Sequence, residues 1–117
     1  MNLFNFEQHR IELETYQKSI LTEKAKEYAA VDLDPKSTLD RLISFKEGGK
    51  LEERNPEEYL RSLQTKHILS VKKLMKDLVN GKVAPFEMWR EKLMDINTYN
   101  ILLLALIKER IEKSDNE

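Results

Sequence analysis

The feature that most constrains the fold is a run of seven apolar residues, from Ile101 to Ile107. A helix built from such a run has no polar stripe, so it is apolar on every side and requires cover all round. The run is also far shorter than the roughly 20 residues that span a bilayer. The sequence therefore predicts a buried, central helix and no membrane segment.

Proline and glycine divide the chain into helical segments, because proline opens helices and glycine closes them. The chain has only three residues of each type, and between them apolar residues recur at steps of three and four. The sequence predicts an all-α fold in one bundle-like domain, 1–117, with the apolar C-terminal helix at its centre. The predicted helices cover residues 6–30, 35–48, 56–80 and 85–112, followed by a polar tail at 113–117.

Local signals place the helix ends. Asp34-Pro35 and Asn55-Pro56 each combine a capping residue with a proline suited to the first helical position. Gly48-Gly49 is expected to stop the second helix, and Asn80-Gly81 to end the third in a tight turn. Within the fourth helix, Phe86 and Tyr99 stand at core spacing.

Composition limits the class of protein. The chain has 117 residues, enough for one small domain, and 20 basic against 21 acidic residues give a net charge of -1. A balance of this kind disfavours nucleic acid as the main partner. The sequence contains no cysteine, which excludes disulfides, thiolate zinc sites and a cysteine nucleophile. The first six residues lack the features of a secretory signal, so the cytoplasm is the expected compartment.

The first and fourth helices need more cover than a four-helix chain of this length supplies. The apolar run needs neighbours on all sides, and the long first helix has little of its own to pack on. A second copy satisfies both, so the sequence predicts a homodimer or a higher oligomer.

Most well-marked enzyme signatures are absent, including a glycine-rich phosphate loop, His-Glu-x-x-His and Gly-x-Ser-x-Gly. Glu91 and Asp95 lie four residues apart, on one face of a helix, where they could share Mg²⁺ or serve as structural partners of neighbouring side chains. His67 faces inward, either as a hydrogen-bonded core residue or as a catalytic base. Lys66 lies on the flank, where it could contact phosphate or be solvated.

Four segments and one tyrosine together resemble a known family. They are Glu23 to Ala29, Asp40 to Lys46, Lys66 to Val71, Glu91 to Asp95, and Tyr99 before the apolar run. The chain resembles a family of small all-helical phage proteins, grouped with the nucleotide-modification-associated domains and distantly similar to the MazG-like all-α nucleotide pyrophosphohydrolases.

This resemblance implies a phage protein that binds nucleotide phosphates through a divalent metal, with Lys66 and His67 at the nucleotide and Glu91 and Asp95 at Mg²⁺. It assigns no catalytic residue. The Glu-Glu-x-x-Glu run that holds magnesium in MazG-like enzymes is missing from residues 56–80. The alternative is a non-enzymatic phage protein, an assembly chaperone or a regulatory protein-interaction module, that acts in the host cytoplasm.

Overall fold

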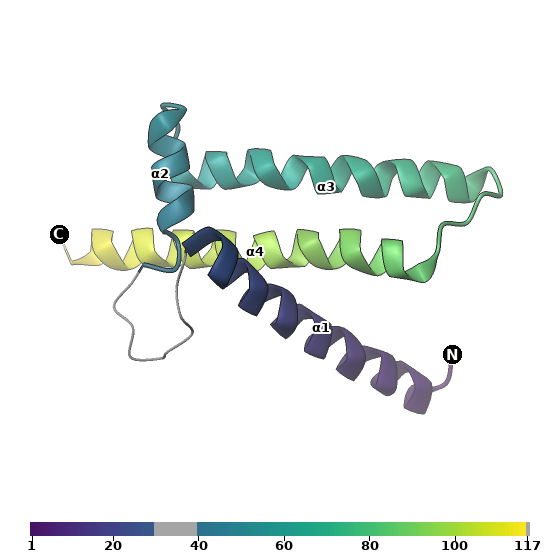
Figure 1. The fold of residues 1–117 in the computed structure, drawn as a ribbon. Coiled ribbons are helices and arrows are strands. Elements are labelled where there is room, and N and C mark those ends of the chain that lie inside the picture. The colour runs from purple at the N-terminus through teal and green to yellow at the C-terminus, as the bar shows by residue number, and fades with distance from the viewer. Residues whose placement is uncertain (30–39, 117) are drawn as a thin grey trace. The chain divides into compact units, whose positions relative to one another are not determined.

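The computed structural model describes residues 1–29 and 40–116, and this part of the chain forms four α-helices and no strand (Figure 1). The predicted all-α fold class is confirmed. None of the described helices is long and apolar enough to cross a membrane. The chain falls into two compact units, Met1–Arg41 and Leu42–Glu117. The helices are α1 (Leu3–Ala29), α2 (Ile43–Leu51), α3 (Pro56–Val79) and α4 (Phe86–Asp115).

In the first unit, α1 begins three residues earlier than expected because Asn2 caps it. The Asn2 Oδ1 accepts a hydrogen bond from the Asn5 backbone N–H at 2.8 Å. Arg41 belongs to the same unit and donates from Nη2 to the Leu21 carbonyl at 3.1 Å. The Asp34-Pro35 signal, predicted to start the second helix, lies outside the described residues.

In the second unit, the prediction that Gly48 and Gly49 stop α2 is wrong, because both lie inside the helix. Each is instead a point of close approach. A Cβ on Gly48 would lie 2.3 Å from the Tyr59 ring, and one on Gly49 would lie 2.7 Å from the Arg54 carbonyl oxygen. The helix ends at Leu51, after which Glu53 adopts a left-handed φ of 55°. The Arg54 N–H then closes the last turn on the Gly49 carbonyl at 2.8 Å.

The signals at both ends of α3 operate as the sequence indicates. Asn55 accepts a hydrogen bond from the Glu58 N–H at 2.8 Å, and Pro56 occupies the first turn. At the other end, Gly81 has a φ of 84°, and the Lys82 N–H donates to the Asp77 carbonyl at 2.9 Å. This is the same closing motif as at the end of α2, here with glycine at the left-handed position.

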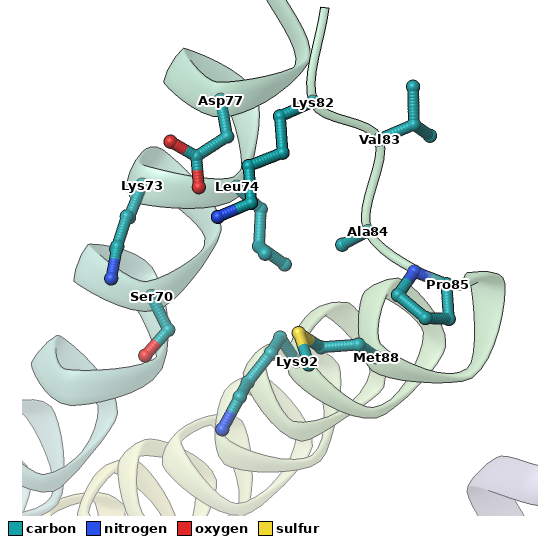
Figure 2. A pocket seen from close by; sticks show the side chains of 10 residues that line it. All are labelled: Ser70, Lys73, Leu74, Asp77, Lys82, Val83, Ala84, Pro85, Met88 and Lys92. Carbon is teal, nitrogen blue, oxygen red and sulfur yellow. The ribbon is translucent and has the colours of Figure 1, made fainter.

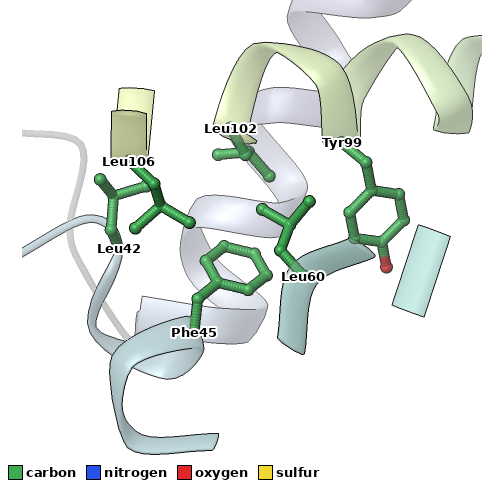
Figure 3. Close-up of a cluster of buried hydrophobic side chains, with 6 residues drawn as sticks. All are labelled: Leu42, Phe45, Leu60, Tyr99, Leu102 and Leu106. Atoms are coloured by element: carbon green, nitrogen blue, oxygen red, sulfur yellow. The ribbon is translucent and has the colours of Figure 1, made fainter. Parts of the chain in front are cut away.

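The core of the second unit lies where α2 packs at one end of the antiparallel pair formed by α3 and α4 (Figure 1). Its buried apolar residues come from all three helices and the residue before α2 (Figure 3): Leu42, Phe45, Leu60, Tyr99, Leu102 and Leu106. Gln64 of α3 is also fully buried, and its Nε2 donates to the Ile96 carbonyl at 3.1 Å and to the Asn100 Oδ1 at 2.7 Å. This polar bridge fixes α3 against α4.

Within the second unit α4 is not covered on all sides, and the sequence predicts that a second copy supplies the missing cover. Leu102 and Leu106 are buried, but Ile101 and Leu104 are 44% and 65% exposed. Phe86, expected in the core, is 55% exposed, whereas Tyr99 is buried as predicted. The helix also extends to Asp115 and takes in most of the predicted polar tail, since that segment contains neither glycine nor proline to stop it.

Candidate functional site

Two of the four predicted site residues come together across α3 and α4. The Nδ1 of His67 lies 3.4 Å from the Oδ2 of Asp95, and their side chains are only 22% and 15% exposed. The imidazole also packs at a tilt against the Tyr99 ring, with 5.4 Å between the ring centroids. His67 therefore faces inward, as expected, and Asp95 has a structural partner on the adjacent helix.

The other two predicted residues remain at the surface. Lys66 and Glu91 are both exposed, and neither has a described contact with the His67–Asp95 pair. Within the described ranges, no group of three or more histidine, aspartate or glutamate side chains is arranged to hold a metal ion. Glu91 and Asp95 would thus give Mg²⁺ two carboxylates at most, which suffices only where substrate phosphates complete the coordination.

A cavity of about 440 Å³ lies at the end of the second unit where the chain turns from α3 into α4 (Figure 2). Lys73, Lys82 and Lys92 bring three ammonium groups to its wall, against one carboxylate from Asp77. The remaining lining is mostly apolar or small: Ser70, Leu74, Val83, Ala84, Pro85 and Met88. A positive rim over an apolar wall suits an anionic group carried on an apolar body.

A second cavity, of about 400 Å³, lies beside α2 and is bordered by ion pairs between helices. The guanidinium of Arg110 binds the Glu57 carboxylate through two hydrogen bonds, of 2.7 and 2.9 Å. Their hydrogen bonding lowers the pKa of Glu57 below its ordinary value of 4.5. Lys46 and Glu109 form a further pair across the same opening. Five basic and three acidic side chains line this cavity, so it has the same excess of two positive charges as the first, but some of its basic groups are engaged in these ion pairs.

An open stripe runs along α4, and the sequence analysis did not identify it. Its positions alternate steps of four and three residues, the spacing of a coiled-coil seam. The residues of this α4 stripe are Phe86, Arg90, Leu93, Asn97, Asn100, Leu104, Ile107 and Ile111. All except Arg90 are exposed, and the five apolar members range from 37% to 65% exposed.

The α4 stripe was detectable in the sequence as a heptad pattern, but the uniform apolar run from 101 to 107 concealed its period. The lysines of the first cavity carried a weaker signal, since they lie on both sides of the Asn80-Gly81 turn. No family model, no curated protein and no solved structure matches this chain.

Proposed function

We propose that this chain is a helical protein-interaction module, the non-enzymatic alternative, and that its α4 stripe binds a helix of another chain. The stripe itself is the observation that carries this proposal. It extends over residues 86–111, about 38 Å of helix, and keeps five large apolar side chains exposed. Exposed apolar surface of this length, arranged at coiled-coil spacing, is typical of a surface that docks a helix.

The arrangement of polar groups supports the same proposal. The His67–Asp95 contact is enclosed between packed helices and has an aromatic neighbour, as in a structural pair. The buried Gln64 bridge serves to align α3 with α4, so that the stripe lies on a rigid scaffold.

The test is a titration with a synthetic amphipathic helix of unrelated sequence that carries leucine at heptad positions. We expect it to bind the wild-type chain, and Leu104→Glu to weaken binding at least tenfold, because burying one leucine contributes about 1.5–3 kcal/mol. Leu69→Glu is the matched control, since Leu69 is 58% exposed but lies on α3. Equal binding by the two variants would refute a role for the stripe.

A second candidate function is binding of nucleotide phosphates, and the lysine-lined cavity favours it. Lys73, Lys82 and Lys92 would contact phosphate oxygens, while Leu74 and Met88 would pack against the apolar part of the ligand. The resemblance to MazG-like proteins points to the same ligand class through Lys66 and His67. Mg²⁺ bridging the phosphates to Glu91 and Asp95 belongs to this candidate.

Isothermal titration of a nucleotide panel, with and without Mg²⁺, tests the second candidate. Asp95→Asn keeps the shape of the side chain but loses the charge that a hard cation requires, so it should abolish Mg²⁺-dependent binding. If Asp95 is only the structural partner of His67, the same change lowers stability by about 1–3 kcal/mol and alters no affinity. Absence of heat with every nucleotide would remove this candidate.

A further inference from the structure

The pattern of residues along the α4 stripe specifies its occupant, an inference that rests on the proposed function. We propose that the stripe pairs with the α4 stripe of a second copy of this chain, running antiparallel. The two asparagines provide the first argument. Asn97 and Asn100 interrupt an otherwise mostly apolar seam, and a polar residue in such a seam sets the register because it is best placed opposite another polar group.

Only one antiparallel register places Asn97 opposite Asn100 of the second copy, and by symmetry it does so twice. The same register places Leu104 opposite Leu93, and Ile111 opposite Phe86. A shift by one heptad in one direction instead places Leu104 opposite Asn100, and a shift in the other places Asn97 opposite Leu93. Apolar residues thus face apolar residues in the register that satisfies the asparagines.

The asparagine side chains are suited to this pairing. The Asn100 Oδ1 accepts the hydrogen bond from Gln64, so its orientation is fixed by the buried bridge between α3 and α4. Its Nδ2 group remains a donor and can reach the Asn97 Oδ1 of the second copy. Both asparagine residues are exposed in the single chain. In the pair, the exposed amide groups of these asparagines would hydrogen-bond to one another instead of to solvent.

Charge complementarity provides the second argument. Glu87 and Lys108 each follow an apolar stripe residue and lie on the same flank of the stripe. In the proposed register, Glu87 of each copy lies beside Lys108 of the other, which gives two opposite-charge contacts per dimer. Arg90 meets Ile107, and the apolar stem of the arginine can pack against that side chain.

Exchange of these charges tests the register. Glu87→Lys and Lys108→Glu should each weaken self-association roughly tenfold at low ionic strength, because each variant sets like charges opposite one another twice. A mixture of the two variants restores opposite charges at both contacts, so the mixed dimer should form with about wild-type affinity. No preference for the mixed dimer would overturn the register.

The relative orientation of the two α4 helices is measured separately. The Ser114→Cys variant has a single cysteine, which carries a spin label. The antiparallel register separates the two labels by roughly 45 Å, whereas a parallel pair would bring them within roughly 10–15 Å. A short distance overturns the proposal. If the chain instead stays at 13.9 kDa at every concentration, the second copy is not the occupant. The proposed function then survives only if the unrelated helix still binds at Leu104.

Discussion

Glu53→Gly is expected to stabilise the unit that contains α2, α3 and α4, even though it removes a side chain. Glu53 has a φ of 55°, a conformation that costs a residue with a Cβ roughly 1–2 kcal/mol. Glycine avoids this cost but loses roughly 0.5–1 kcal/mol more conformational entropy on folding. The Glu53 side chain is exposed, so little packing is lost. The net gain is about 0.5–1 kcal/mol, or roughly 2–8 °C in Tm.

Two further variants test whether backbone conformation causes the expected stabilisation by Glu53→Gly. Glu53→Ala removes the charge but keeps the Cβ, so we expect no comparable gain. Gly81→Ala places a Cβ at the matching position after α3, where φ is 84° and no atom lies within 4 Å of the new Cβ. The expected loss of about 1 kcal/mol in unfolding free energy would therefore reflect backbone conformation alone. Urea and thermal unfolding measure all three. The reasoning is refuted if Glu53→Gly is no more stable than wild type, or if Glu53→Ala gains as much.

Three further predictions concern packing and charge. Gln64→Ala should lower the unfolding free energy by about 2–4 kcal/mol, through three lost hydrogen bonds and a cavity, and Gln64→Leu should lower it by clearly less; equal losses in urea unfolding would contradict this. Gly49→Ala should lower the unfolding free energy by about 1–2 kcal/mol, because the clash with the Arg54 carbonyl outweighs the gain of about 1 kcal/mol in helix propensity. A raised Tm would contradict this and would show that the backbone shifts to accommodate the new methyl group. Glu57→Gln should lower Tm at about pH 7 and by less at about pH 3, because hydrogen bonding to Arg110 lowers the pKa of Glu57 and the resulting stabilisation, complete above the ordinary pKa, decreases as pH falls below it. A difference in Tm that is unchanged between the two pH values would argue against that ion pair.

Helix ends that depend on neighbouring residues alone could be predicted from the sequence. Asn55 and Pro56 act within one turn of the start of α3, and Gly81 is needed for the left-handed residue that ends it. Gly48 and Gly49 are also glycines, but their role differs from that of Gly81. They are glycine because Tyr59 and the Arg54 carbonyl approach them closely, and such contacts are set by tertiary packing. The left-handed residue of α2 is a glutamate, which the sequence does not mark.

The candidate sites show the same division between local and tertiary information. The inward direction of His67 follows from its helical spacing, but its contact with Asp95 depends on how α3 packs on α4. Gln64 was missed because a polar residue among apolar ones is usually read as surface. The sequence predicts that α4 needs more cover than one chain supplies, but it does not show which residues of the helix stay exposed. The structure leaves one face of that helix open, and self-association remains a prediction that this open face supports.

The most direct test of the account is the mass of the wild-type chain and of Leu104→Glu, measured side by side by multi-angle light scattering across micromolar concentrations. If the α4 stripe joins two copies, the wild-type mass rises towards twice 13.9 kDa with concentration, while Leu104→Glu stays at 13.9 kDa and keeps its helical circular dichroism spectrum. A variant that associates as strongly as the wild type would contradict the account, because the two copies would then meet through another surface.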